Sequence, residues 1–144
     1  MAQNFHNLSV ALKLIGAGSV LLMVSTLLPW YSDIDAFRIG DMFLGVTGPA
    51  SFVGIVILLL GLLSFSFVGT RLLDRRQLKV PMKESIFQLF VGIESLFLLL
   101  VVNSIYFHPK FGINITLKES RFGMVLAVLG AVLLIAGGYM QNKR

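Results

Sequence analysis

The chain alternates between long apolar stretches and short polar segments. Four apolar stretches run over Leu8–Leu28, Gly48–Gly69, Ser85–Tyr106 and Phe122–Met140. Each is close to the ~20 residues that an α-helix needs to cross the hydrocarbon core of a bilayer. Backbone N–H and C=O groups in lipid must be paired within their own segment, so these stretches are expected to be helices. The pattern predicts an all-α membrane protein in which residues 1–144 form a single domain, a four-helix transmembrane bundle.

The distribution of basic residues predicts how such a bundle would be oriented. The segment Thr70–Lys83 between the second and third stretches contains five basic residues and one acidic residue. Together with Lys13, Lys143 and Arg144, it places eight of the twelve basic residues on one side. The positive-inside rule assigns that side to the cytoplasm, so we expect a multi-pass protein of the cell membrane with both termini cytoplasmic. A basic segment also suits RNA or anionic headgroups, but orientation of the spans explains it, and no nucleic-acid partner is expected.

Composition supports the same class. Hydrophobic residues make up 56% of the chain and charged residues 13%, about half the ~25% that is usual in soluble domains. The lipid bilayer is therefore the first expected partner. The chain contains 0 cysteines, which excludes disulfide chemistry, thiolate metal sites and a cysteine nucleophile.

Aromatic residues follow the first and third apolar stretches. Trp30 and Tyr31 come directly after Pro29, and Tyr106 ends the third stretch. Tryptophan and tyrosine are enriched at the height of the lipid headgroups, because their rings are amphipathic. We therefore predict that these three residues anchor the protein at the outer membrane interface.

The two polar segments on the outer side carry weaker signals for strands. Gly112–Lys118 alternates apolar and polar residues and includes β-branched ones, and Ala36–Phe43 is a less regular partner. The segment Ser32–Thr47 has a net charge of −2 and His108–Arg121 a net charge of +2, so the two should approach each other. We predict a small extracytoplasmic cap, with a short β-hairpin-like antiparallel pair formed by these two strands.

Small residues in the apolar stretches indicate where helices approach closely. Gly123, Ala127 and Ala131 follow one another at intervals of four, and Gly54 and Gly61 are seven residues apart. Such small-xxx-small ridges let two helix backbones come together in a membrane. Packing within one four-helix bundle is the favoured interpretation, and self-association of two copies is the alternative.

One charged residue lies in the middle of an apolar stretch. Glu94 is about 15 Å along the helix from the inner end of the third stretch, where a carboxylate costs ~2.5–3.5 kcal/mol or more. Gln88 and Ser95 are near it in depth, so these three residues form a candidate intramembrane polar site. In one hypothesis Glu94 is a proton or cation site in a transport path. In the other it stays neutral and donates a hydrogen bond to a neighbouring helix.

Other searches for chemistry give little. The outer acidic residues Asp33, Asp35 and Asp41, with His108 and Glu119, are of the type that binds hard cations, but their spacing matches no metal-binding loop. The sequence contains no phosphate-binding glycine loop, nucleophile elbow or zinc-binding histidine pair. No metal, cofactor or catalytic residue is therefore assigned, and the protein is expected not to be an enzyme.

The order of these features resembles a known type of membrane protein. Leu-Pro-Trp at 28–30 after the first span, Gly-Val-Thr-Gly at 45–48, the basic connector and the final span with Gly123–Ala131 resemble the small four-span membrane proteins common in bacteria and archaea. The layout is also similar to that of the claudin-like tetraspans, but this chain lacks their paired loop cysteines and their Gly-Leu-Trp run. The resemblance implies a fold and a membrane location, and it implies no activity.

Two classes of function follow from the sequence. The first, which is preferred, is a non-catalytic membrane scaffold or accessory subunit that acts through lateral helix contacts and its outer loops, with another membrane protein or a second copy as partner. The second is a small proton- or cation-coupled transporter or channel subunit that uses Glu94.

Overall fold

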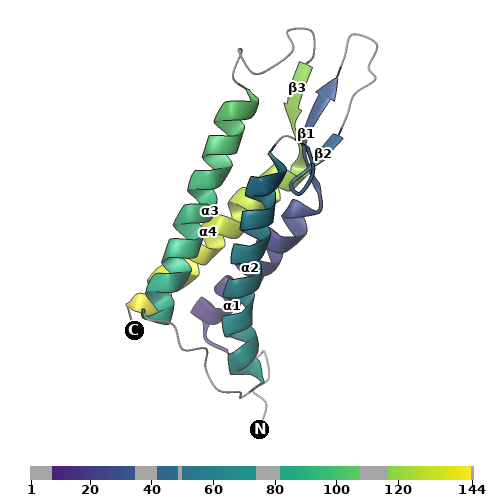
Figure 1. Cartoon of the computed structure of the whole chain (residues 1–144). Coiled ribbons are helices and arrows are strands. Elements are labelled where there is room, and N and C mark those ends of the chain that lie inside the picture. Colours follow the sequence, from purple (N-terminus) through teal and green to yellow (C-terminus); the bar gives the residue numbers. More distant parts are fainter. Residues whose placement is uncertain (1–7, 35–41, 49, 74–81, 108–116, 144) are drawn as a thin grey trace.

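Four helices and a small three-stranded sheet make up the protein (Figure 1). The computed structural model describes residues 8–34, 42–48, 50–73, 82–107 and 117–143. The helices are α1 (Val10–Thr26), α2 (Ser51–Leu72), α3 (Glu84–Tyr106) and α4 (Phe122–Asn142). The strands are β1 (Pro29–Ile34), β2 (Met42–Leu44) and β3 (Leu117–Ser120).

The helices lie where the apolar pattern predicts them. Helices α2, α3 and α4 contain 22, 23 and 21 residues, and each is long and apolar enough to cross a membrane. Helix α1 is apolar as well but has only 17 residues. It ends at Thr26, two residues before the end of the predicted span, because the chain turns there into strand β1.

Local sequence explains how two of the helices begin. Helix α1 starts after Ser9, whose side chain accepts a hydrogen bond from the backbone N–H of Leu12 at 3.3 Å, the usual role of an N-cap serine. Helix α2 follows a tight turn in which Gly48 has a φ of +79°. Only glycine adopts this backbone conformation without strain, so Gly48 determines the entry into α2.

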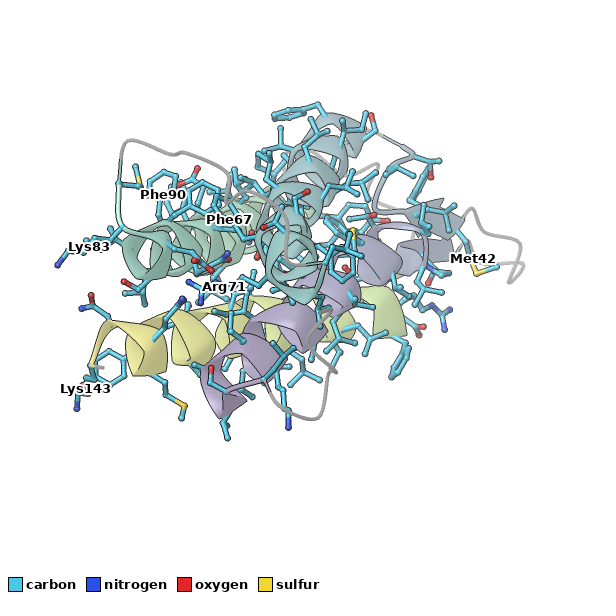
Figure 2. The ribbon with its side chains drawn as sticks, turned by 90° about the horizontal axis from the view of Figure 1, so that it is seen from below. Met42, Phe67, Arg71, Lys83, Phe90 and Lys143 are labelled. Carbon is cyan, nitrogen blue, oxygen red and sulfur yellow. The ribbon has the colours of Figure 1, made fainter. Side chains whose placement is uncertain are left out.

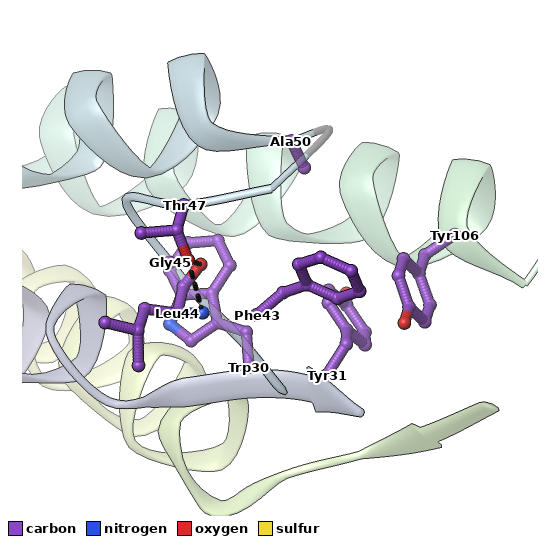
Figure 3. Close-up of a pocket in the computed structure, with 8 residues that line it drawn as sticks. All are labelled: Trp30, Tyr31, Phe43, Leu44, Gly45, Thr47, Ala50 and Tyr106. Carbon is purple, nitrogen blue, oxygen red and sulfur yellow. Dashed lines mark hydrogen bonds between the residues drawn. The ribbon is translucent and has the colours of Figure 1, made fainter. Parts of the chain in front are cut away.

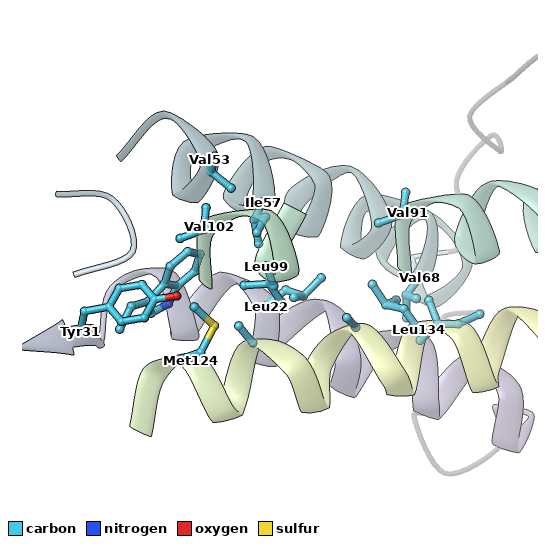
Figure 4. Packing of buried hydrophobic residues seen from close by; sticks show 14 residues of the cluster. Leu22, Tyr31, Val53, Ile57, Val68, Val91, Leu99, Val102, Met124 and Leu134 are labelled. Carbon is cyan, nitrogen blue, oxygen red and sulfur yellow. The ribbon is translucent and has the colours of Figure 1, made fainter. Parts of the chain in front are cut away.

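The helices pack in a ring in which each contacts two neighbours. Helix α4 packs against α1 and α3, and α2 packs against α1 and α3 on the other side, with α2 and α3 touching least closely. The beginnings of α1 and α3 and the ends of α2 and α4 lie at one end of the molecule, and the sheet lies at the other (Figure 1). We call these the inner end and the outer end. Apolar side chains from all four helices and β1 fill the space between them; Figure 4 labels Leu22, Ile57, Leu99 and Leu134 among these.

Helices α1 and α4 approach each other closely where they cross. A Cβ atom placed on Gly18 would lie 2.7 Å from the carbonyl oxygen of Gly130, and one placed on Gly130 would lie 2.9 Å from the carbonyl oxygen of Gly18. Both helices therefore require glycine at this contact. Farther inward, a Cβ on Gly137 would lie 2.9 Å from the carbonyl oxygen of Ala11, so the close contact continues along the pair.

The sheet differs from the expected pair of strands. Its order is β2-β1-β3, with both pairs antiparallel. The central strand β1 begins directly after α1, where the sequence predicted only membrane anchors. Proline is tolerated at the first position of a strand, and Trp30 and Tyr31 favour extended structure, so Pro29–Ile34 fits this role.

The predicted pairing of Ala36–Phe43 with Gly112–Lys118 is therefore wrong where it can be compared. The described parts of these segments belong to β2 and β3, which lie on opposite sides of β1. Residues 36–41 and 112–116 lie outside the described residues. The two outer segments do meet, because β1 pairs with β3 from Tyr31 opposite Ser120 to Ile34 opposite Leu117.

The glycine crossing predicts a difference between two neighbouring substitutions. Gly18→Ala should lower the free energy of unfolding by about 1–3 kcal/mol, because the new methyl group collides with backbone of α4. Gly16→Ala is the matched control: its Cβ would lie 3.6 Å from Val68 Cγ1, an ordinary contact. That change should be neutral or stabilising by up to ~1 kcal/mol through helix propensity. Denaturant titration in detergent micelles measures both, and equal effects of the two changes would contradict this account of the crossing.

Candidate functional site

Polar side chains from three helices meet in the interior. Ser19 of α1 and Ser64 of α2 lie 2.7 Å apart between their hydroxyl oxygens, and the Ser64 hydroxyl donates to Oε1 of Gln88 on α3 at 2.5 Å. All three side chains are fully buried. A hydroxyl has one proton, so when Ser64 donates to Gln88, the proton between the two serines must come from Ser19. The carbonyl oxygen of Ile15, also 2.7 Å from the Ser19 hydroxyl, competes for that proton. We refer to Ser19, Ser64 and Gln88 as the polar network; it links α1, α2 and α3.

The network leaves two buried groups of α3 without partners. Nε2 of Gln88 and the hydroxyl of Ser95 have no hydrogen-bond partner among the described residues, and both side chains are fully buried. The two residues are seven apart, so they lie on the same face of α3, about 10 Å apart along its axis. They share the core-facing side of the helix without touching each other.

Glu94 does not join this group. It is partly exposed, and it makes no hydrogen bond or ion pair with another described residue. As the neighbour of Ser95 along the helix, it points about 100° away from it. The sequence placed Glu94, Gln88 and Ser95 in one candidate site because of their similar depth. In the structure, Gln88 and Ser95 face the core, and Glu94 lies at the edge of the exposed face of α3.

Trp30 lies in the core of the outer cap. Its side chain is 1% exposed, and its indole N–H donates to the carbonyl oxygen of Ser25 at 2.8 Å. Cβ atoms placed on Gly45 and Gly123 would lie 2.6 Å and 2.9 Å from its ring, so glycines on two sides make room for it. Trp30 was predicted to anchor the protein at the membrane interface; in the structure its ring is enclosed within the molecule, between the segments of the two glycines.

Tyr31 is buried beside Trp30 and stacks on the end of α3. Its ring lies 4.0 Å from the ring of Tyr106, nearly parallel, and Phe107 contacts it edge-on. Tyr31 is 2% exposed, so it too is a packing residue of the cap, whereas Tyr106 is half-buried. Burial, together with the neighbouring Tyr106 hydroxyl, raises the pKa of Tyr31 well above its ordinary value of 10.0. The stack fastens the sheet to α3.

A small pocket lies between the cap and the start of α2 (Figure 3). Its volume is about 10 Å³, about enough for one water molecule. The residues that line it are Trp30, Tyr31, Phe43, Leu44, Gly45, Thr47, Ala50 and Tyr106. Most of the wall is apolar or aromatic, and the Thr47 hydroxyl is already used to accept from the backbone N–H of Leu44 at 2.9 Å. A pocket of this size holds no organic ligand.

The small residues singled out from the sequence have two different roles. Ala127 and Ala131 are fully buried within the molecule, and Gly61 faces α1, with a placed Cβ 2.9 Å from Met23. Gly123 and Gly54 instead face the cap. A placed Cβ on Gly123 would lie 2.6 Å from the carbonyl oxygen of Pro29, and one on Gly54 would overlap the carbonyl of Gly45. Their assignment to helix–helix contacts is corrected accordingly. Gly18, another small residue of the first apolar stretch, makes a close helix contact with Gly130.

The inner end carries an ion pair and several cations. Arg71 at the end of α2 contacts Glu84 at the start of α3 at 2.6 Å, across the basic connector. Ser85 donates to the Asn142 side chain at 3.2 Å, which ties the start of α3 to the end of α4. Figure 2 shows Lys83 and Lys143 on this side of the molecule. Polar contacts therefore join α2 to α3 and α3 to α4 at the inner end.

No metal site is present in the part of the chain that the structure describes, where no three acidic or histidine side chains gather. Three of the residues that the sequence analysis considered for binding a cation, Asp35, Asp41 and His108, lie outside that part. No protein-family model, curated protein or solved structure matches the chain.

The polar network predicts that replacing one serine of α2 lowers the stability of the protein and that replacing another does not. Ser64→Ala should lower the free energy of unfolding by about 1–2 kcal/mol, because it leaves Oε1 of Gln88 buried without a donor. Ser66→Ala is the matched control, since Ser66 is exposed and bonds only to Leu62 of its own helix; it should stay within ~0.5 kcal/mol. Unfolding in micelles measures both. Adding Gln88→Leu to Ser64→Ala should restore part of the loss, and strict additivity would count against the network.

The buried tyrosine predicts a pH dependence of stability. Above pH ~10, unfolded Tyr31 has lost its proton while folded Tyr31 retains it, so the free energy of unfolding falls as pH rises, by up to about 1.4 kcal/mol per unit. Tyr31→Phe keeps the ring stack and should remove this slope, with no loss of stability at pH 7. Tyr139→Phe, at a 52% exposed ring, serves as the control. Identical alkaline slopes for Tyr31→Phe and the parent protein would contradict the burial of this hydroxyl.

Proposed function

We propose that the protein is a non-catalytic integral membrane protein of the cell membrane, a scaffold or accessory subunit that acts by lateral contact with another membrane component. In this proposal all four helices span the bilayer as a transmembrane bundle, and both termini are cytoplasmic. The likeness to the small four-span proteins of bacteria and archaea remains part of the proposal.

The outward faces of the helices support a membrane location. Large apolar side chains are exposed along the full length of α2, α3 and α4, for example Phe52, Leu59, Phe97, Leu100, Val125 and Val132. Water would penalise this surface heavily, whereas lipid tails cover it without cost. Helix α1 is short, but it lies against both α2 and α4, and its start is beside the end of α4. The cations Arg71, Lys83 and Lys143 at the inner end favour a cytoplasmic location of that end.

The polar network is the observation that favours a scaffold over a transporter. A transport path needs polar groups that face a solute or a file of water. Ser19, Ser64 and Gln88 instead bond to one another across three helices. The transport alternative depends on Glu94. This residue lies away from Gln88 and Ser95, at the edge of the exposed face of α3. The interior is therefore suited to holding helices together, and the outer surface is left for partners.

Ion flux in reconstituted liposomes tests the proposal against transport. The protein and its Glu94→Gln variant should both show proton, sodium and potassium flux at the level of empty liposomes, because in the described interior the side chains of Ser19, Ser64 and Gln88 bond to one another. A pH-sensitive dye and ion-selective dyes inside the vesicles measure the flux. Flux above the empty-liposome level that Glu94→Gln abolishes would replace the scaffold with the transporter.

Lateral contact is tested separately by crosslinking in native membranes. A photoreactive phenylalanine analogue at Phe97, which is 58% exposed, should give an adduct of one discrete mass with a membrane protein. The same analogue at Leu99, which is 2% exposed, is the matched control and should crosslink only within the chain. Adducts with lipid alone at Phe97 would count against a scaffold that works through α3.

A further inference from the structure

Helix α3 presents a regular stripe of large apolar side chains on its exposed face, the face turned away from the core. Ile86, Phe90, Ile93, Phe97 and Leu100 follow one another at intervals of four, three, four and three residues, and they are 46–62% exposed. This is the a/d spacing by which one helix packs along another. Figure 2 shows Phe90 on the side of α3 that is turned away from α4. In a bilayer such a stripe fits a second helix and fits lipid tails equally well, so by itself it selects no partner.

Glu94 lies at the flank of this stripe. It follows Ile93 directly and precedes Phe97 by three residues, which corresponds to the e position beside an a/d seam, where interhelical ion pairs form. It is on the side of the stripe toward α2, because it is seven residues from Phe87, whose ring packs against Phe67 of α2 at 4.9 Å. At ten residues from Glu84 it is about 15 Å from the inner end of α3, near the middle of a span.

A carboxyl group at this depth requires a partner from outside the molecule. Glu94 makes no hydrogen bond or ion pair with the other described residues, and it is partly exposed, so a neighbouring helix can reach it. An acid in the middle of a bilayer is costly unless a cation or a hydrogen-bond donor meets it. A carboxylate is complemented best by lysine or arginine.

Among the described residues, a second copy of this chain offers no cation at the depth of Glu94. In the described residues, Lys13 is in the first turn of α1, Arg71 is at the end of α2, Lys83 and Arg121 precede α3 and α4, and Lys143 follows α4. Each lies near a helix end, about 10 Å or more from the depth of Glu94. The described part of the chain therefore favours a complementary residue from another protein.

We propose that the stripe of α3, together with Glu94, is the docking site for a transmembrane helix of a different membrane protein that carries a lysine or arginine near the middle of its span. This proposal rests on the proposed scaffold function and names the chemistry of the partner. The apolar stripe positions the partner helix, and the ion pair with Glu94 selects it over other helices.

Energy transfer in liposomes tests the docking site. The chain contains no cysteine, so Lys143→Cys provides a single labelling position on the full protein. The probes are labelled leucine-rich helices that differ only at their centre, one with lysine and one with leucine. The central-lysine helix should bind about 3- to 20-fold more tightly than the central-leucine helix, the range expected for one polar contact between helices in a membrane.

Two variants make the test specific. Glu94→Gln should reduce the preference for lysine to less than about twofold. Glu119→Gln removes the same kind of group from the exposed outer strand β3 and should leave the preference unchanged. Equal binding of the two probe helices, or a lysine preference that survives Glu94→Gln, overturns the proposal. Stronger transfer between two copies of the full chain than to the lysine helix, lost in Glu94→Gln, assigns the face to a second copy and also overturns it.

Failure of this proposal is distinguishable from failure of the scaffold function. Absence of a lysine preference together with flux at the empty-liposome level overturns the docking site and leaves the scaffold in place. Flux that depends on Glu94 overturns the scaffold whatever the probe helices do.

Discussion

Close contact between the backbones of α1 and α4 is the constraint on which the rest of the structure depends. Helices surrounded by lipid gain little from burying apolar side chains, so they associate through backbone proximity and well-matched packing. Gly18 and Gly130 provide this at the crossing, where neither helix has room for a side chain. Because α4 also packs against α3 through Gly92 and Gly138, it holds the helices on either side of it. Helix α2 then completes the ring through α1.

The polar network and the cap fix the relative positions of the helices, which the glycine contacts alone leave free to slide or rotate. Apolar ridges allow helices to slide or rotate relative to each other, whereas hydrogen bonds between Ser19, Ser64 and Gln88 are satisfied in one register only. At the outer end, the ring of Trp30 is enclosed by Gly45 and Gly123, and Tyr31 stacks on Tyr106. The cap therefore joins α1, α3, α4 and the start of α2. Its three strands form a sheet that is stable because it rests on the helix ends.

The sequence predicted the helices well and the cap poorly, for physical reasons. A run of ~20 apolar residues indicates one structure in lipid, so the helices lie within a few residues of the predicted bounds. Pro29–Ile34 was misjudged because tryptophan and tyrosine are enriched both at membrane interfaces and in strands, and only tertiary packing distinguishes the two. Depth along a helix grouped Glu94 with Gln88 and Ser95. Their separation depends on which face of α3 meets its neighbours. That face is set by Gly92, whose close partners lie on α4, and by Gly138 of α4, whose close partners lie on α3.

Helix α3 divides its residues more sharply than the other helices do. Its inner side carries the small and polar residues Ser85, Gln88, Gly92 and Ser95, and its outer side carries phenylalanine, isoleucine and leucine. Lipid rewards large apolar residues on any outward face, so the outer side alone needs no further explanation. The carboxyl group of Glu94, on the border of that side, does need an explanation. The buried side of the same helix already contains unpaired polar groups, those of Gln88 and Ser95, to which a carboxyl group could bond. The position of Glu94 at the border of the exposed face of α3, rather than on the buried face with Ser95, is therefore the feature of this fold that packing within the molecule does not account for.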